Sequence, residues 1–134
     1  MIFGVGIDIA KCARFEKWLK TPGMAERFFN PKEMAQSGAD WNELTDAQKN
    51  TRLQHCAARF AAKEAFSKAL GSGLVFELRD VFVTNAASGK PELCIEKSAL
   101  KAFKDRCPDW QKAKIFVSLS HEKEYAVAQV IIEI

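Results

Sequence analysis

The sequence lacks most of the features that mark secreted, membrane-bound and standard nucleotide-binding proteins. No apolar run approaches the length of a membrane span, and the first residues have no basic region of the kind that opens a signal peptide. There is no P-loop and no GxGxxG pattern, which disfavours the standard nucleotide folds. The net charge of +3 makes no strong case for nucleic acid, although it suits an acidic partner. We therefore expect a cytoplasmic protein that acts without a membrane or a nucleic acid.

Zinc sites and disulfide frameworks have little support either. The cysteines show no CxxC spacing, and only two histidines are available to help them bind a metal. The residues concerned are Cys12, Cys56, Cys94, Cys107, His55 and His121. Reduced thiols in the cytoplasm are the better interpretation of these cysteines.

The pattern of apolar residues predicts a single α+β domain over residues 1–134. A chain of 134 residues with 48% hydrophobic content has the length and the core of one domain. Periodicity and breaking residues predict strands at 2–9, 81–84, 92–96, 114–120 and 125–134. They predict helices at 10–20, 24–29, 30–37, 45–70 and 98–107, with a loop at 38–44. This order argues for a mainly antiparallel sheet packed against a long central helix.

The long helix carries the first candidate functional residues. A capping box over Thr45–Gln48 opens it, and Gly71 stands where a left-handed cap is usual after Leu70. Small and apolar residues surround most of its last turns, so we expect burial on more than one side. Glu64 and Lys68 nevertheless share one stripe at i, i+4 spacing. On their own they are either an ordinary exposed pair, worth about 0.2–0.5 kcal/mol, or a place where a metal or phosphate is held.

The first predicted strand adds an acid to this picture. Gly4, Gly6 and Asp8 share one face of the strand, and two glycines beside an acid indicate that something approaches this face closely. Either the glycines make room for a packed helix and Asp8 caps the next helix, or Asp8 projects into a cleft as a metal ligand. The residues alone give these two interpretations equal weight.

A basic surface follows the first strand. Lys11, Arg14, Lys17 and Lys20 lie on one side of the helix predicted at 10–20, and Arg27 adds charge further on. Most surfaces of this kind are simply solvated. The functional alternative is a docking surface for an acidic partner, which opposite charge would steer into place.

Asp8 and Glu64 together suggest a type of chemistry. Two carboxylates from separate elements can hold Mg²⁺, which shares the rest of its shell with waters and substrate phosphates. Nearby lysines and arginines would neutralise phosphate oxygens, which suits phosphoryl transfer. Two other classes remain open at this stage. One is a non-catalytic basic binding module, and the other is a different Mg²⁺-dependent phosphotransferase that uses a nucleotide.

Two stretches resemble the signature motifs of the 4′-phosphopantetheinyl transferases. They are Gly6-Ile7-Asp8 and Phe60-Ala61-Ala62-Lys63-Glu64-Ala65-Phe66-Ser67-Lys68, the second of which fits (W/F)xxKExxxK. The resemblance is closest to the short bacterial type, the holo-acyl-carrier-protein synthases. It extends to Arg59, Gly89-Lys90-Pro91, Ser118-Leu119-Ser120-His121 and Glu124-Tyr125-Ala126, so it spans nearly the whole chain. The segment 36–51 matches least.

The resemblance implies the family's fold and reaction. The enzyme would transfer 4′-phosphopantetheine from coenzyme A to a serine of an apo acyl carrier protein, of fatty-acid or polyketide type, and release 3′,5′-ADP. Asp8 and Glu64 would bind Mg²⁺ or Mn²⁺, since both ions accept oxygen ligands. Lys68 would act on the same phosphates as an acid or as a clamp, and the serine proton would go to Glu64 or to a metal-bound water. These three are the implied catalytic residues.

The resemblance also implies binding surfaces and an assembly. The implied coenzyme A contacts are Arg59, Lys63, Lys68, Gly89, Lys90, Pro91, Ser120 and His121, with Lys49 or Arg52 as weaker candidates for the 3′-phosphate. His121 is equally well a structural turn residue. The resemblance implies that Arg14 is the main residue that docks the acidic carrier protein. The supporting residues would be Lys11, Lys17, Lys20 and Arg27. Short members with one copy of the fold resemble homotrimers with the site between subunits, so we expect a homotrimer.

Overall fold

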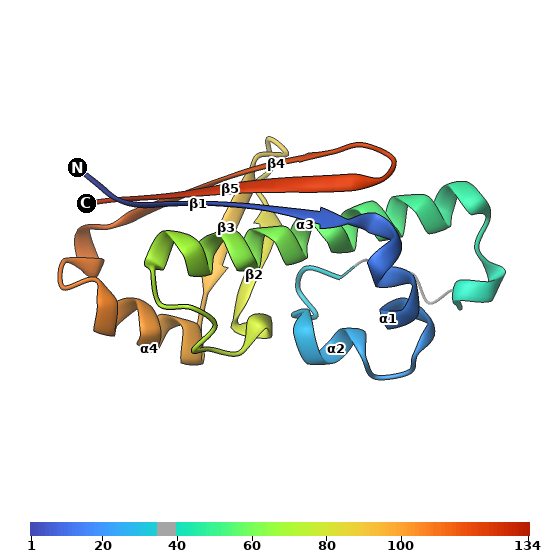
Figure 1. Cartoon of the computed structure of the whole chain (residues 1–134), viewed down its shortest axis with the longest axis horizontal. Helices are drawn as coiled ribbons and strands as arrows, with labels where there is room; N and C mark the ends of the chain where they lie inside the picture. Colours follow the sequence, from blue (N-terminus) through green and yellow to red (C-terminus); the bar gives the residue numbers. More distant parts are fainter. Residues whose placement is uncertain (35–39) are drawn as a thin grey trace.

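A long helix, α3 (Asp46–Leu70), forms the centre of the computed structural model, which describes residues 1–34 and 40–134. A three-stranded antiparallel sheet in the order β1–β5–β4 lies along this helix, and a second antiparallel sheet pairs β2 with β3 (Figure 1). The strands are β1 (Ile2–Lys11), β2 (Val81–Asn85), β3 (Pro91–Ile95), β4 (Lys114–His121) and β5 (Tyr125–Glu133). The predicted α+β class, with antiparallel pairing and a long central helix, is confirmed.

Shorter helices complete the chain. The α-helices besides α3 are α1 (Glu16–Lys20), α2 (Ala25–Phe28) and α4 (Lys97–Arg106). The 3-10 turns are η1 (Cys12–Phe15), η2 (Trp41–Glu43), η3 (Leu78–Asp80) and η4 (Trp110–Lys112). Within the described ranges, no helix is long and apolar enough to cross a bilayer.

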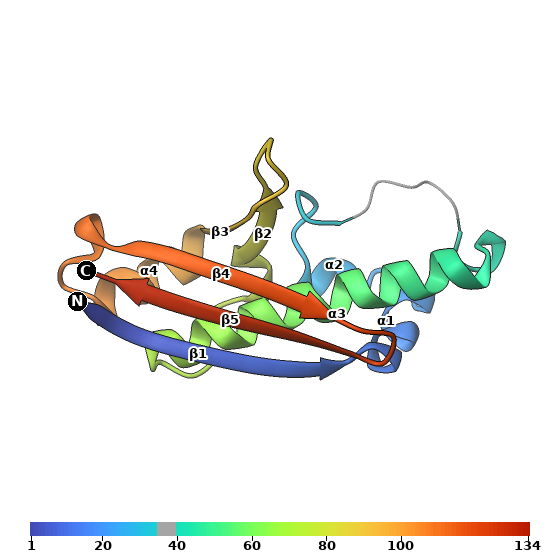
Figure 2. The ribbon, with the colours of Figure 1, turned by 90° about the horizontal axis from the view of Figure 1, so that it is seen from above.

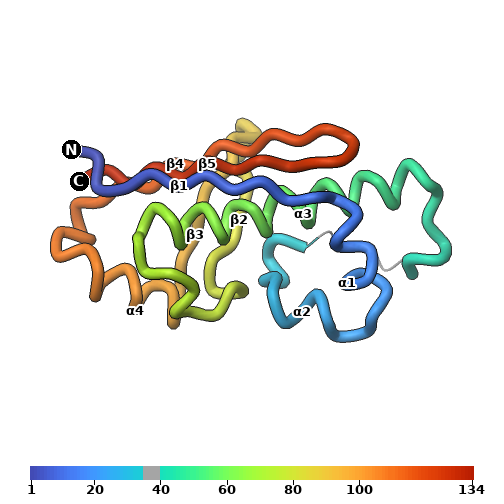
Figure 3. The backbone as a smooth tube through the Cα atoms, viewed as in Figure 1, coloured from blue at the N-terminus to red at the C-terminus, as the bar shows by residue number. Residues whose placement is uncertain are grey.

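The elements are arranged along the length of α3. From above, β1, β5 and β4 lie side by side over this helix, and the β2–β3 hairpin projects on the β4 side (Figure 2). The helices α1 and α2 lie together near the end of β1. The two chain ends meet at the opposite end of the sheet (Figure 3), where the Met1 amino group donates to the Ile134 carbonyl at 2.5 Å. The β4 edge of the sheet therefore lies on the side of the β2–β3 hairpin, whereas the β1 edge lies on the other side.

The ends of α3 follow the predicted signals. The Thr45 hydroxyl accepts from the Gln48 N–H at 3.2 Å, and the Gln48 side chain accepts from the Thr45 N–H at 2.9 Å. Gly71 caps the other end with a φ of 73°, in the left-handed region that glycine enters without a steric penalty. A cap of the first kind stabilises a helix by about 1 kcal/mol.

The glycines of β1 explain how closely the sheet approaches α3. A Cβ at Gly4 would lie 1.8 Å from the Ala69 carbonyl oxygen, and one at Gly6 would lie 1.8 Å from the Ala65 carbonyl oxygen. No side chain fits at that distance, so these glycines make room for the packed helix. The same close contact carries Asp8, on the same face of β1, toward α3.

The opposite face of the sheet is apolar and exposed. On β1, the exposed fractions of Val5, Ile7 and Ile9 are 52%, 58% and 63%. Phe116 of β4 and Tyr125 of β5 are 44% and 39% exposed on the same sheet. An exposed cluster of large apolar side chains on one face is typical of an interaction surface.

The helix predicted at 10–20 is wrong at its start, because β1 continues to Lys11. Ala10 pairs with Ala126 and Lys11 pairs with Tyr125, so the strand ladder outcompetes the local helical pattern. The 3-10 turn η1 and then α1 follow. Lys11 therefore lies at the end of a strand and is not part of the predicted basic helix.

The helix predicted from Asn30 is a turn over residues 31–33 in the described part of the chain. Asn30 behaves as an N-cap, since its side chain accepts from the Lys32 N–H at 3.0 Å. The Glu33 carboxylate, however, turns into the core to meet Lys63 of α3. The predicted end of this helix near Gly38 lies outside the described residues, and the loop predicted at 38–44 contains η2.

Candidate functional site

The core of the candidate site lies where the end of β1 contacts the last turns of α3. The Lys68 ammonium donates to the Asp8 carboxylate at 3.0 Å and to the Ile7 carbonyl at 2.9 Å. The Asp8 side chain is 17% exposed and that of Lys68 is 53% exposed. A cavity of about 330 Å³ opens here, lined by Ile7, Asp8, Ile9, Lys68 and Val127. Asp8 therefore lines a cavity, while the glycines beside it make room for α3, so each interpretation of the first strand is met in part and the role of Asp8 as a metal ligand stays a prediction.

Glu64 stands on the same side of α3, one turn before Lys68. Partial burial raises the pKa of the Glu64 carboxyl, and the negative charge of Asp8 raises it further. Lys68 and Arg14 act in the opposite direction, and they lower this pKa. The two carboxylates are therefore close enough to repel one another.

A divalent cation fits this pair of carboxylates. Bound between Asp8 and Glu64, it would replace their repulsion with attraction to both. In the described part of the chain, no group of three or more His, Cys, Asp and Glu side chains could hold a metal ion. A site with two carboxylates leaves most of the coordination shell to waters and phosphate oxygens, which is the usual arrangement for Mg²⁺.

Lys63 does not reach this site, although it is adjacent to Glu64 in the sequence. Its ammonium is fully buried, pairs with the Glu33 carboxylate at 2.5 Å and donates to the Val81 carbonyl. The predicted contact between Lys63 and coenzyme A phosphates is wrong in this structure, because the side chain is 0% exposed. Lys63 instead joins α3 to β2 and to the turn after Asn30.

Glu33 is a key residue of this junction. Its carboxylate accepts from the Asn30 N–H at 2.9 Å and from the Val83 N–H at 3.3 Å, besides its bond to Lys63. Its carbonyl contacts His55 Nε2 at 2.5 Å. The bond to Asn30 is local, but nothing in the local pattern indicates Lys63 as a partner.

Arg14 lies on η1, where aromatic rings hold its guanidinium. The guanidinium carbon is 4.6 Å from the ring centre of Phe60 and 5.7 Å from those of Phe15 and Trp18. Such cation–π contacts contribute about 0.5–1 kcal/mol each when exposed. Arg14 is also close enough to lower the pKa of Glu64. This predicted docking residue therefore stands beside the carboxylate pair.

The other predicted docking residues are more scattered. Lys17 and Lys20 are exposed on α1, where Lys20 pairs with Glu16 at 3.0 Å. Arg27 is exposed on α2. Among these predicted docking residues, Arg14 is the one whose charge acts on Glu64.

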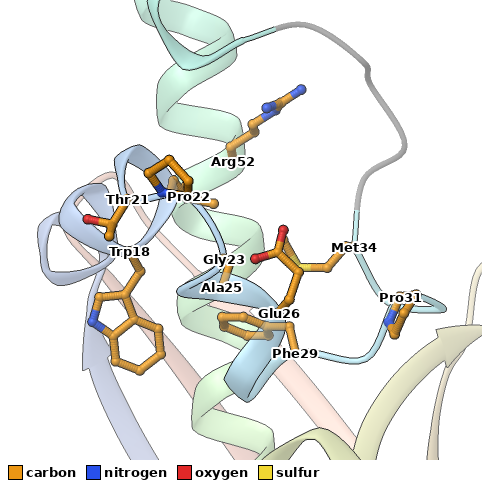
Figure 4. Close-up of a pocket in the computed structure, with 11 residues that line it drawn as sticks. Trp18, Thr21, Pro22, Gly23, Ala25, Glu26, Phe29, Pro31, Met34 and Arg52 are labelled. Carbon is orange, nitrogen blue, oxygen red and sulfur yellow. The ribbon is translucent and has the colours of Figure 1, made fainter.

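A pocket of about 410 Å³ is lined by residues of α1, α2 and α3 (Figure 4). Trp18, Phe29 and Met34 supply apolar walls, while Glu26 and Arg52 line it with charge. It lies apart from Asp8 and Glu64 and adjoins the basic helix α1.

The predicted coenzyme A contacts on the hairpin lie at the other edge of the sheet. Gly89 and Lys90 are exposed in the turn between β2 and β3, and Pro91 begins β3. A second cavity of about 410 Å³ lies between β3 and β4, and Lys90, Pro91 and Phe116 help to line it. Arg59 of α3 reaches toward this turn, and donates to the Asn85 side chain at 3.3 Å.

Ser120 and His121 are also at the β4 edge. Ser120 pairs with Val127 of β5, which in turn pairs with Ile9 of β1. Two strand spacings, about 10 Å, therefore separate Ser120 from β1. The alternation of the strand puts Ser120 on the exposed face, whereas Asp8 faces α3. Within one chain, the predicted site residues therefore form two separate groups, one around Asp8 at the β1 edge and one around Ser120 and the hairpin turn at the β4 edge.

Comparison with known proteins gives a consistent result. The model of the 4′-phosphopantetheinyl transferase superfamily matches residues 4–130. The holo-[acyl-carrier-protein] synthase of Treponema denticola is 44% identical over 134 residues, which cover 99% of each chain. A crystal structure of a holo-(acyl-carrier-protein) synthase from Bacillus anthracis, in complex with CoA (3′,5′-ADP), has 34% identity and a TM-score of 0.69 over 98% of this chain and 96% of that one. The holo-[acyl-carrier-protein] synthase of Neisseria meningitidis has 30% identity and a TM-score of 0.74, with 99% of both chains covered.

Proposed function

Because the chain belongs to the 4′-phosphopantetheinyl transferase superfamily, and within it to the holo-[acyl-carrier-protein] synthase type, we propose how its residues carry out that family's reaction. The enzyme transfers 4′-phosphopantetheine from coenzyme A to a serine of an apo acyl carrier protein. The products are the holo carrier protein and 3′,5′-ADP. The observation that carries the mechanism is the junction of Asp8 on β1 with Glu64 and Lys68 on α3.

The reaction is a displacement at phosphorus. The serine oxygen of the carrier protein forms a bond to the phosphorus that bears the pantetheine arm. The bond from that phosphorus to the bridging oxygen breaks, and 3′,5′-ADP leaves with the electron pair. The serine proton goes to Glu64 or to a water beside it, and the raised pKa of Glu64 suits this role.

We propose that Asp8 and Glu64 hold Mg²⁺, with Mn²⁺ as a substitute of similar ligand preference. When bound, the ion would withdraw charge from the pyrophosphate and stabilise the leaving oxygen. Lys68 can exchange its bond with Asp8 for a bond to the phosphates, because its side chain is half exposed. This exchange would deliver a positive charge where negative charge develops.

We propose a homotrimer with the site shared between neighbours. One group of predicted contacts lies at the β1 edge and the other at the β4 edge, which suits a substrate that lies between two copies. The exposed apolar face on β1 would be covered in such an assembly, and repeated head-to-tail contacts close into a ring.

Sedimentation should give a trimer for the wild type and a monomer for Ile7→Glu. Val75→Glu, a change at an equally apolar and 67% exposed position outside the sheet, is the matched control. A trimeric Ile7→Glu variant would contradict the assignment of this face.

The basic surface of η1 and α1 is proposed as the docking site for the acidic carrier protein. Arg14 is the leading residue because its guanidinium is held over Phe60 beside the carboxylate pair. The exposed Lys17 and Lys20, with Arg27 of α2, extend the positive charge.

The four free cysteines suit the reducing cytoplasm in which we expect the enzyme to act.

Mass spectrometry of an apo carrier protein tests this function. Incubation with coenzyme A, Mg²⁺ and the enzyme should add the mass of one phosphopantetheine arm. A purely binding protein would leave the mass unchanged, and a phosphotransferase that uses a nucleotide would add only the mass of a phosphate, and only in a parallel reaction that contains ATP. Either of these results would overturn the proposal.

A further inference from the structure

We propose that Asn85 is a positioning residue for coenzyme A, which ties Arg59 of α3 to the turn that carries Gly89, Lys90 and Pro91. The inference rests on the proposed contacts of Arg59 and this turn with coenzyme A. It assigns a role to a side chain that lies outside the signature motifs. Asn85 would hold the phosphate-binding cation and the turn beside the adenine at a fixed separation.

Both ends of the Asn85 amide are used. Its oxygen accepts from Arg59 Nη2 at 3.3 Å, and its nitrogen donates to the Gly89 carbonyl at 2.9 Å. This pattern fixes the orientation of the amide, since the reversed orientation would set donor against donor and acceptor against acceptor. A single short side chain therefore bridges α3 and the tip of the β2–β3 hairpin.

The protein satisfies the Arg59 guanidinium only in part. Its Nε is buried, and no hydrogen-bond partner for it exists among the described residues. Burial lowers the pKa of the guanidinium, which means that the surroundings poorly replace its hydration. An anion beside this half-buried guanidinium would offset its lost hydration, and the phosphates of coenzyme A are anions of the right kind. The bond to Asn85 holds the guanidinium in place before the anion arrives.

The turn itself keeps its shape without Asn85. The Ala86 N–H donates to the Lys90 carbonyl at 2.9 Å, and the Gly89 N–H donates to the Ala86 carbonyl at 2.8 Å. The ladder between β2 and β3 continues below it. Asn85 is exposed, so its loss creates no cavity in the core. The amide therefore sets where the turn lies relative to Arg59, whereas the backbone sets how the turn is folded.

Two variants separate the two halves of the link. Asn85→Asp keeps an acceptor for Arg59 but places an oxygen against the Gly89 carbonyl. Asn85→Leu removes both bonds at similar volume. We expect Asn85→Asp, which loses one bond, to raise the KM and the calorimetric Kd for coenzyme A by about three- to tenfold, and we expect a larger rise for Asn85→Leu, which loses both. The kcat, the KM for the carrier protein and the melting temperature should stay at wild-type values.

Ser88→Ala is the matched control in the same turn. The Ser88 hydroxyl accepts only a long bond of 3.4 Å from the Lys90 N–H, and it does not join the turn to α3. This variant should bind coenzyme A like the wild type. Arg59→Leu should weaken coenzyme A binding at least as much as Asn85→Leu.

The outcomes are distinct. An unchanged Kd for coenzyme A in both Asn85 variants overturns the positioning role. Parallel losses in kcat, both KM values and melting temperature would assign Asn85 to structure alone, which also overturns it. If Arg59→Leu binds coenzyme A like the wild type, the proposed phosphate contact fails while the transferase function stands. A wild-type enzyme that forms no holo carrier protein would instead refute the function, and this inference with it.

Discussion

The buried pair of Lys63 and Glu33 provides a quantitative test of how the signature motif is used. Both side chains are 0% exposed, and Glu33 also accepts two backbone N–H bonds. Lys63→Met removes the cation and leaves a carboxylate in the core without its partner. Breaking a buried pair on one side costs about 3–5 kcal/mol of folding free energy. With a urea m-value of roughly 2 kcal/mol per molar, the unfolding midpoint should fall by about 2 M.

The assay is urea unfolding followed by circular dichroism, with coenzyme A affinity measured in parallel. The double variant Lys63→Met with Glu33→Gln should recover most of the lost stability, because the amide has no charge to bury. Coenzyme A affinity of the folded fraction should stay unchanged. The reasoning is refuted if Lys63→Met keeps wild-type stability and binds coenzyme A more weakly, since that is the behaviour of an exposed phosphate ligand.

The remaining predictions concern docking, ionisation and packing. Arg14→Gln, which removes the positive charge without adding a carboxylate beside Glu64, should lower kcat/KM for the carrier protein by about tenfold and change coenzyme A binding much less. Lys101→Gln, an equal charge change on α4 at a position 78% exposed, is the control, and equal loss of both substrates would contradict the docking surface. The raised pKa of Glu64 keeps this carboxyl protonated at pH values where an ordinary glutamate is ionised, so Mg²⁺ affinity should fall on acidification earlier than for an unperturbed glutamate. Lys68→Met removes a cation that lowers this pKa, so calorimetric titrations should show the Mg²⁺ affinity falling at a still higher pH. A fall at lower pH would contradict the placement of Lys68 beside Glu64. Gly6→Ala should destabilise the fold by roughly 1–3 kcal/mol in thermal unfolding, because its Cβ meets the backbone of Ala65; wild-type stability would contradict the close packing of β1 on α3.

The long helix could be predicted from the sequence because its signals are local. The capping box over Thr45–Gln48 and the glycine at position 71 lie within a few residues of the ends that they define. The end of β1 could not be predicted, because the partners of Ala10 and Lys11 come from the far end of the chain. The same limit applies to Glu33, whose partner Lys63 lies 30 residues further along the chain.

The candidate site shows the same division. The pairing of Asp8 with the Glu64–Lys68 stripe was accessible, because the glycines of β1 indicated close contact and the motif supplied the partner. The motif did not predict that the Lys63 and Glu64 side chains point in different directions. Neighbouring residues on a helix point about 100° apart, so one faced the core and the other the cleft. The link from Arg59 through Asn85 to Gly89 likewise depends on where the hairpin meets α3.

The central claim is that Glu64 and Asp8 form the metal-dependent transfer site, and Glu64→Gln tests it most directly. The variant removes a charge that Asp8 opposes, so it should fold with at least wild-type stability in metal-free buffer. Its initial rate of holo carrier protein formation, measured by mass spectrometry with coenzyme A and Mg²⁺, should fall by about two orders of magnitude or more, as the wild-type rate should after chelation with EDTA. A folded Glu64→Gln variant that forms holo carrier protein at the wild-type rate would contradict the account.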